Sequence, residues 1–194
     1  MNLSARAALY NSAFPQFPPV HVVGTADGGE RIESLWIMGN NYRTSGYYGA
    51  YPHGYLARVM SMFPDAHDVL HVPSGSIQPG PYLRIDIRPE VNPDIVGDCH
   101  DIKALVCDRR FDLVLMDIPY SSEDAEHYGR PMVNRNRVLA SALEVTRPGG
   151  WVVCLDQVLP MWRKADARLV MAIGMVKSTN HRVRGVFGFR KADA

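Results

Sequence analysis

Residues 111–122 read FDLVLMDIPYSS, and the fold prediction starts from them. FDLVLM is an almost unbroken apolar run of strand length, which is typical of a parallel strand that is buried on both faces. The run ends at Asp117, and Pro119 then removes a backbone donor and fixes its own φ, so the strand must stop. Ile118 is pushed towards an extended conformation because it precedes a proline. The stretch therefore predicts a buried strand that ends in an acid and a stiff corner capped by the ring of Tyr120.

This corner offers the groups that would hold a flat amine. The carboxylate of Asp117 and a backbone carbonyl near Ile118 provide two acceptors for an NH2 group, and Tyr120 offers a face for stacking. Stacking of a base on an aromatic ring is worth about 1–3 kcal/mol. An ordinary proline turn explains the tetrapeptide equally well when it is considered alone. The interpretation therefore depends on the rest of the chain.

Other segments repeat the pattern of an apolar strand that ends in small or acidic residues. DVLHVPSG ends in Pro73, Ser74 and Gly75, YLRIDIRPE contains Asp86, and PDIVGDCHD contains Asp98. Ligands of open α/β sheets bind outside the carboxyl ends of the parallel strands, where the following loops converge. We therefore expect one edge of the sheet to carry a glycine turn and the acids of three strands.

That edge suits a cofactor that contains a nucleoside. A turn of small residues lets a ligand approach the backbone, an acid on the second strand can accept hydrogen bonds from both ribose hydroxyls, and an acid on the third can accept one from an adenine amine. A single aspartate at a strand end is more often a turn or cap residue, so the order of all of them carries the prediction. The predicted cofactor-binding residues are Pro73, Ser74, Gly75, Asp86, Ile87, Asp98, Cys99 and Asp117, and the predicted catalytic residues are Asp117, Pro119 and Tyr120.

With these residues the chain resembles the amino-methyltransferases that use S-adenosylmethionine. Their motif is an Asp or Asn, a variable or Pro position, then Pro and an aromatic, which Asp-Ile-Pro-Tyr at 117–120 fits. Ile118 departs from the Asp-Pro-Pro-Tyr of DNA amine methyltransferases and is closer to the Asn-Ile-Pro-Tyr or Asn-Leu-Pro-Tyr of ribosomal adenine dimethyltransferases. RPGG at 147–150 is similar to the family's turn before the fifth strand, whereas VLHVPSG lacks the Gly-x-Gly of its first motif.

The resemblance implies the class I methyltransferase fold, an α/β Rossmann-like architecture. We expect a mostly parallel seven-stranded sheet with a reversed final strand, helices on both faces and an N-terminal β-hairpin. The whole chain, 1–194, is expected to be a single methyltransferase domain. Residues 1–65 would supply the hairpin, a Tyr-rich loop and a helix, and residues 66–194 the catalytic core. Residues 1–18 end in FPQFPP and are expected to be irregular.

The resemblance also implies in-line transfer of a methyl group from a sulfonium to an exocyclic amine, with adenine N6 in DNA as the first choice. RNA adenine and protein glutamine remain alternatives. The missing Gly-x-Gly leaves open a binding subunit that has lost turnover, and the absent glycine fingerprint argues against a dinucleotide enzyme. No metal is expected, and the cysteines lack a motif that would make one a nucleophile.

Composition limits the setting and the partners. The formal charge of +1 neither demands nor excludes nucleic acid. Three cysteines without a CxxC pair indicate reduced thiols, and no apolar run approaches the length of a membrane span. We expect a cytoplasmic protein that binds nucleic acid, DNA rather than RNA, and no membrane. Since the chain has no room for a separate recognition domain, its loops, a partner subunit or a homodimer would recognise the target.

Two loops and the C-terminal segment are further candidates for contacts with the target. The Tyr-rich loop would form a lid or a stacking surface through Tyr42, Tyr47, Tyr48, Tyr51 and His53, and His53 or Tyr55 would approach the cofactor. Basic side chains near the site would meet phosphates or form a basic rim, namely Arg130, Arg135, Arg137, Arg182, Arg184, Arg190 and Lys191. Solvated loop charges are the commoner explanation of such residues.

Overall fold

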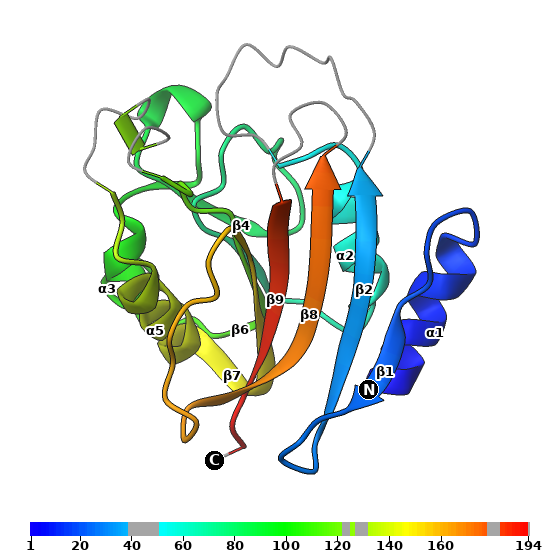
Figure 1. Ribbon diagram of the computed structural model, residues 1–194. Helices are drawn as coiled ribbons and strands as arrows, with labels where there is room; N and C mark the ends of the chain where they lie inside the picture. Colours follow the sequence, from blue (N-terminus) through cyan, green and yellow to red (C-terminus); the bar gives the residue numbers. More distant parts are fainter. Residues whose placement is uncertain (39–50, 122–124, 127–131, 178–182, 194) are drawn as a thin grey trace.

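The computed structural model describes residues 1–38, 51–121, 125–126, 132–177 and 183–193. These residues form a nine-stranded sheet with the order β1-β2-β8-β9-β7-β6-β3-β4-β5 (Figure 1). The strands are β1 (His21–Gly24), β2 (Glu30–Met38), β3 (Val69–His71), β4 (Leu83–Asp86), β5 (Ile95–Val96), β6 (Phe111–Met116), β7 (Thr146–Asp156), β8 (Ala167–Lys177) and β9 (Val183–Lys191). The helices are α1 (Leu3–Ala13), α2 (Tyr55–Ser61), α3 (Ile102–Val106) and α5 (Arg135–Val145), with short 3-10 turns at Pro89–Val91 and Cys99–Asp101.

The sheet confirms the expected fold class. β3, β4, β5, β6 and β7 run parallel to one another, and β9 is antiparallel to both β7 and β8, so the final strand is reversed. β3 to β9 supply the expected seven strands. The N-terminal hairpin of β1 and β2 extends the same sheet, because β2 pairs in parallel with β8 from Ile32↔Met171 to Met38↔Lys177. The hairpin is therefore part of the sheet rather than an appendage.

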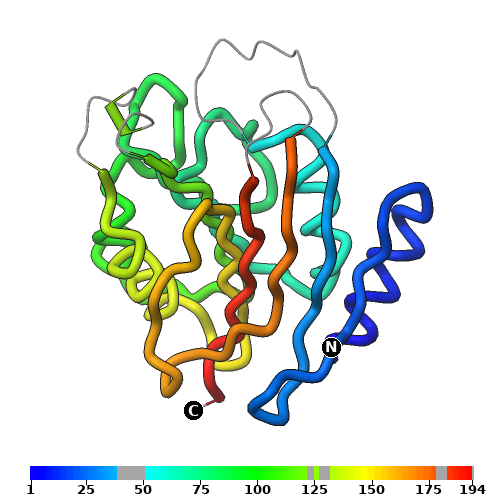
Figure 2. Tube along the Cα trace, in the orientation of Figure 1, coloured from blue at the N-terminus to red at the C-terminus, as the bar shows by residue number. Residues whose placement is uncertain are grey.

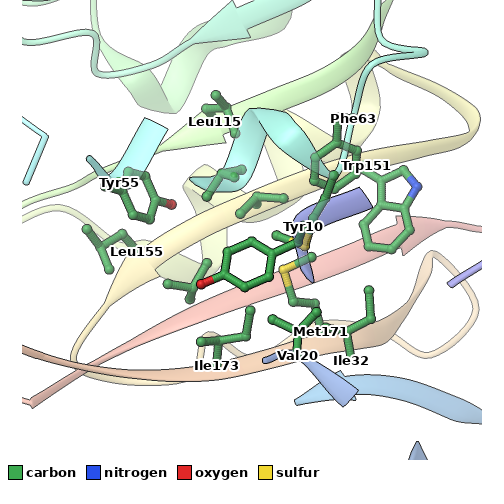
Figure 3. Packing of buried hydrophobic residues seen from close by; sticks show 14 of the residues in the cluster. Tyr10, Val20, Ile32, Tyr55, Phe63, Leu115, Trp151, Leu155, Met171 and Ile173 are labelled. Carbon is green, nitrogen blue, oxygen red and sulfur yellow. The ribbon is translucent and has the colours of Figure 1, made fainter. Parts of the chain in front are cut away.

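Helices cover the two faces of the sheet and create two cores (Figure 2). β6 contributes to both, because alternate side chains of a strand point to opposite faces. Leu113 and Leu115 pack with α1 and α2, whereas Val114 and Met116 pack with α3 and α5. The first core gathers large aromatic and sulfur-containing side chains between the helices and the sheet (Figure 3). This double burial explains why the β6 sequence is apolar without alternation.

The second face is covered less completely. Ile37, Val176 and Val183 lie side by side on neighbouring strands, and the register places all three on one face. Ile37 is 58% exposed and Val183 is 63% exposed, since no described helix covers this corner of the sheet. The expectation of helices on both faces is confirmed by α1 and α2 on one face and α3 and α5 on the other. No helix in the described part of the chain has the length and apolar character needed to cross a membrane.

The N-terminal segment differs from the sequence prediction. Residues 1–18 were expected to be irregular, yet Leu3–Ala13 forms helix α1 beside β1 and β2 (Figure 1). The side chain of Asn2 caps the helix by accepting a hydrogen bond from the amide of Ala5 at 2.9 Å. Tyr10 is fully buried and stacks on Trp36 of β2, with ring centroids 5.4 Å apart. The prolines end the helix, and they do not keep the preceding residues from forming one.

RPGG also takes a more regular form than a simple turn. Helix α5 ends at Val145 and β7 begins at once with Thr146, so the tetrapeptide lies inside the first part of the strand. Gly149 adopts φ 69°, a conformation that favours glycine. The Arg147 guanidinium binds Asp112 and Asp68, each at 2.6 Å. Arg147 therefore connects the amino-terminal ends of β3, β6 and β7. This edge of the sheet is opposite the edge that carries Asp86, Asp98 and Asp117.

Replacing Arg6 with alanine should lower the free energy of unfolding by about 2–3 kcal/mol. Arg6 is 5% exposed, donates to the main-chain oxygen of Met62 at 2.6 Å and binds both oxygens of Asp65. Its guanidinium also lies 4.6 Å from the ring centroid of Phe63. The substitution therefore leaves a buried carbonyl without its donor and frees α1 from the end of α2. Urea denaturation measures the loss.

Arg163→Ala is the matched control for this prediction. Arg163 binds Asp166 at 2.7 Å, but it is 82% exposed, so its loss should change stability by less than about 0.5 kcal/mol. Equal effects of the two substitutions would show that burial of Arg6 does not anchor α1.

Candidate functional site

A cavity opens beyond the carboxyl ends of β3, β4, β5 and β6, at the edge where the acids were expected. The strands bring together residues that are far apart in the sequence, because parallel strands all present their carboxyl ends on the same side. The lining residues are Pro73, Gly75, Ile85, Asp86, Ile87, Arg88, Gly97, Asp98, Cys99, His100, Asp117, Pro119, Ala125, Met132 and Val133.

Most of the predicted site residues meet in this cavity. The lining includes Pro73, Gly75, Asp86, Ile87, Asp98, Cys99, Asp117 and Pro119. Ser74 is buried and does not line it. Tyr120 also lies outside the lining and packs against the first core, next to Asp117. Asp117 is therefore the residue that joins the cavity to the Tyr120 corner.

The glycine turn and Asp86 form one hydrogen-bonded unit. Asp86 is 3% exposed, and its Oδ2 accepts from the amide of Gly75 at 2.8 Å while its Oδ1 accepts from the amide of Arg88 at 3.0 Å. Gly75 has φ 54°, a conformation that favours glycine. Because glycine has no side chain, a ligand in the cavity can come close to the backbone there. A carboxylate has about four acceptor positions, so the two amides leave capacity for a pair of hydroxyls. This set of donors and acceptors fits a ribose, although the turn lacks the Gly-x-Gly motif.

Asp98 forms the second acidic wall together with His100. Oδ1 of Asp98 accepts from the His100 amide at 2.9 Å and contacts Nδ1 of the same ring at 2.7 Å. Nε2 of His100 accepts from the amide of Asn134 at 3.0 Å, so Nδ1 carries the ring proton and donates it to Asp98. Burial alone would raise the pKa of Asp98, but the hydrogen bonds from His100 lower it overall. Asp98 is therefore held as a carboxylate, an acceptor for an amine.

Asp98, Cys99 and His100 place their donor atoms within 4.8 Å of one another, as metal ligands do. Their chemistry argues against that role. Both ring nitrogens of His100 already have partners, and burial, with the charge of Asp98, raises the pKa of the Cys99 thiol to about 12. A metal needs the thiolate and a free imidazole nitrogen. The group is better explained by the cavity wall that its hydrogen bonds build.

The Asp117 corner contains a chain of polar contacts. The hydroxyl of Tyr120 donates to Oδ1 of Asp117 and accepts from Nη1 of Arg184 at 3.1 Å. The Arg184 guanidinium also lies 4.2 Å from the Tyr120 ring centroid. Burial raises the pKa of Asp117 to about 6, against the lowering effects of Tyr120 and Arg184. Ile118 is buried in the second core, and its packing there anchors the turn between Asp117 and Tyr120.

Arg135 and Asp156 support the same corner from its other side. Asp156 is fully buried and binds Nε of Arg135 at 3.0 Å. Nη2 of Arg135 reaches the main-chain oxygen of Tyr120 at 3.5 Å. Sequence reasoning considered Arg135 and Arg184 only as basic rim residues, and it missed Asp156 entirely. The signal for Asp156 was present, since it ends the apolar run WVVCLD just as Asp117 ends FDLVLM.

The described part of the Tyr-rich segment packs on the sheet instead of covering the cavity. Tyr51 stacks on Tyr55 with ring centroids 5.5 Å apart, and its hydroxyl lies 3.4 Å from Nδ1 of His71. Tyr55 is fully buried in the first core, and neither Tyr55 nor His53 lines the cavity. Tyr42, Tyr47, Tyr48, Arg130 and Arg182 lie outside the described residues.

Of the comparisons with known proteins, the one with solved structures finds similar chains. No protein-family model matches the chain, and no curated protein matches its sequence. The tRNA m1G37 methyltransferase from M. jannaschii is similar in structure, with a TM-score of 0.53 and 13% identity over 91% of this chain and 57% of that chain. A putative class I S-adenosylmethionine-dependent methyltransferase from Listeria monocytogenes has a TM-score of 0.47 at 12% identity, over 70% of this chain and 57% of that chain. TrmN from Thermus thermophilus has a TM-score of 0.46 at 16% identity, over 70% of this chain and 48% of that chain.

The chain thus spans only about half the length of these three proteins. At this level of identity the similarity concerns the fold and does not extend to substrates or partners. The order of the strands, the reversed β9 and the similarity to the archaeal enzyme agree with one another. The chain therefore has the fold of the class I S-adenosylmethionine-dependent methyltransferases.

Proposed function

We propose that the chain transfers a methyl group from S-adenosylmethionine to an exocyclic amine, most specifically N6 of adenine in DNA. The observation that carries this proposal is the position of Asp117, which lines the cavity and also forms the polar corner with Tyr120. A donor in the cavity and an amine at the corner would both lie against this one carboxylate. The resemblance of residues 117–120 to the amine-binding motif supports the same arrangement.

The cavity residues fit the proposed cofactor. Asp86 would hold the ribose hydroxyls, Asp98 the adenine amine, and Ile87 and Val133 contribute apolar surface to the lining. The carboxylates of Asp86 and Asp98 in the lining also favour a ligand that carries positive charge. When bound, S-adenosylmethionine supplies an activated methyl group on a sulfonium.

The chain's own residues would orient the amine. Oδ2 of Asp117 and the carbonyl after it accept the two hydrogens of the NH2 group, which fixes the direction of the nitrogen lone pair. Asp117 can then take the proton that the methylated nitrogen releases. Most of the acceleration would come from this positioning and from the fixed charges of the corner. A target base inside a duplex would have to be flipped out of the stack to reach the corner.

Methyl transfer from labelled cofactor tests the proposal. The purified chain is incubated with duplex DNA, single-stranded DNA, RNA and protein, and the labelled product is digested and identified. The expected product is N6-methyladenine from DNA. Label in RNA or in glutamine would keep the chemistry and replace the substrate.

Calorimetry with S-adenosylmethionine and with NAD separates the remaining alternatives. Binding of S-adenosylmethionine without transfer to any polymer would favour a binding subunit. Binding of NAD alone would contradict the proposed chemistry altogether.

Transfer should fall as the pH drops through about 6, by about tenfold for each further unit. Asp117 must be ionised to accept the amine and its proton, and burial raises its pKa to about 6, above the usual value of about 3.9. The carboxylate is therefore almost fully ionised at pH 8 and only about one-tenth ionised at pH 5. The initial rate at saturating cofactor, measured from pH 5 to 9, gives the midpoint. A rate that stays constant down to pH 5 would show that Asp117 does not titrate in the reaction.

A further inference from the structure

Arg184 makes contacts that neither the sequence pattern nor the cavity explains. It lies near the start of β9, 64 residues from Tyr120, yet its Nη1 donates to the Tyr120 hydroxyl at 3.1 Å. Its guanidinium also faces the Tyr120 ring, 4.2 Å from the centroid. Among the described residues its buried Nε has no hydrogen-bond partner. The hydrogen bond and the ring contact described for this side chain are therefore both with Tyr120.

We propose that Arg184 is a positioning residue: it holds the ring and hydroxyl of Tyr120 so that Oδ1 of Asp117 is occupied and Oδ2 faces the amine. The inference rests on the proposed function for the identity of the group at Oδ2.

The direction of the hydrogen bonds follows from the chemistry of a hydroxyl group. A phenol has one hydrogen to donate and lone pairs to accept. Arg184 can only donate, so it occupies a lone pair of the Tyr120 oxygen, and the phenol hydrogen goes to Oδ1 of Asp117. A substrate amine would then meet the remaining oxygen. Without Arg184, the Tyr120 hydroxyl would lose the contact that fixes its orientation.

Charged groups from several elements face Asp117. Arg184 on β9 and Lys177 on β8 favour the carboxylate, whereas Asp156 on β7 opposes it. Tyr120 on the same turn stabilises the carboxylate through its hydrogen bond. The charge of Asp117 in turn contributes to the raised pKa values of Tyr51 and Tyr55. Burial, the largest influence, raises the pKa of Asp117. Removing Arg184 takes away a favourable charge and also loosens the Tyr120 hydrogen bond, so both losses raise the pKa of Asp117 further.

The test compares Arg184→Met with Arg184→Lys. Methionine keeps an unbranched side chain without the charge, and lysine keeps the charge without the planar fork. The matched control is Arg190→Met, an exposed arginine on the same strand. Carbon-13 NMR of labelled aspartate follows the titration of Asp117, and Asp117→Asn identifies its signal. Thermal unfolding checks that each variant is folded.

In the wild type the Asp117 signal should titrate near pH 6. Arg184→Met should raise this midpoint by about one unit, Arg184→Lys by less, and Arg190→Met not at all. The acid limb of the transfer reaction should move by the same amount, with a larger effect on kcat than on the KM for cofactor. A folded Arg184→Met protein with an unchanged midpoint overturns the inference.

The Tyr120→Phe background tests whether Arg184 acts through the hydroxyl. Arg184→Lys should shift the Asp117 midpoint less in Tyr120→Phe than in the wild type, because the hydrogen-bonded chain is already broken there. Equal shifts in both backgrounds overturn this part of the proposal. Because this comparison uses Arg184→Lys, it tests the role of Arg184 even when Arg184→Met does not fold. The NMR titration needs no methyl acceptor. A shifted midpoint without transfer to any polymer would therefore support the role of Arg184 and contradict the proposed function. An unchanged midpoint in a folded Arg184→Met protein, with methyl transfer in the wild type, would support the proposed function and contradict the role of Arg184.

Discussion

Asp117→Ala should reduce methyl transfer by at least about 100- to 1000-fold while cofactor binding stays close to that of the wild type. The lost carboxylate is the group that would hold the amine and receive its proton. The proposed cofactor contacts lie mainly elsewhere, at Asp86 and Asp98, whose hydrogen-bond partners do not include Asp117. The loss should therefore appear in kcat and in kcat/KM alike, as expected for an interaction made in the transition state.

Single-turnover transfer with saturating cofactor measures this effect, and calorimetry measures the affinity. Asp101→Ala is the matched control, because Asp101 carries the same charge near the cavity wall but does not line the cavity. Asp101 pairs with Arg137 at the surface, so its loss should leave both quantities nearly unchanged. Wild-type rates in folded Asp117→Ala would remove Asp117 from the mechanism.

Much of the cavity could be predicted because it depends on local sequence and on one general property of parallel sheets. FDLVLM is apolar at nearly every position, so its burial on both faces is visible without any partner. Asp117 directly follows this run, Asp86 ends β4 and Asp98 comes just after β5, and parallel strands bring their carboxyl ends together. The structure places all three in the lining of one cavity.

Contacts between distant segments could not be predicted in the same way. Arg184 and Tyr120 are 64 residues apart, and Arg135 and Asp156 are 21 apart. Each contact depends on the order and register of strands, which the sequence does not state. From composition alone, Arg184 was one of several basic residues at a rim. The pairing of β2 with β8 has the same origin, since a hairpin carries no mark of the strand it will join.

Local competition explains the error at the N-terminus. The prolines of FPQFPP led to the prediction that the whole segment 1–18 is irregular. However, LSARAALYNSA at 3–13 contains good helix formers, and Asn2 caps it. Burial of Tyr10 and Arg6 against the sheet and α2 then stabilises the helix. Prolines limit where a helix ends, but they say little about the residues before them.

Asp86→Ala should weaken binding of S-adenosylmethionine by about 100-fold, or about 2.8 kcal/mol. Two effects combine in this substitution. The ribose hydroxyls would lose a charged acceptor, and hydrogen bonds to charged groups are worth about 1.5–3 kcal/mol each. The amides of Gly75 and Arg88 would also lose their partner, so the turn that approaches the ligand would no longer be held in place. The free energy of unfolding should fall by about 1–3 kcal/mol for the same reason.

Asp86→Asn separates these two effects. An asparagine side chain fits the same space and keeps one acceptor oxygen, so it can hold one of the two amides but cannot accept from both hydroxyls as a carboxylate does. We expect calorimetry to show a weaker cofactor affinity than in the wild type, with a smaller loss of stability than in Asp86→Ala. Asp101→Asn, with its carboxylate outside the cavity, should bind normally. If Asp86→Asn binds S-adenosylmethionine as tightly as the wild type, then Asp86 only supports the turn and the ribose must be held by another group.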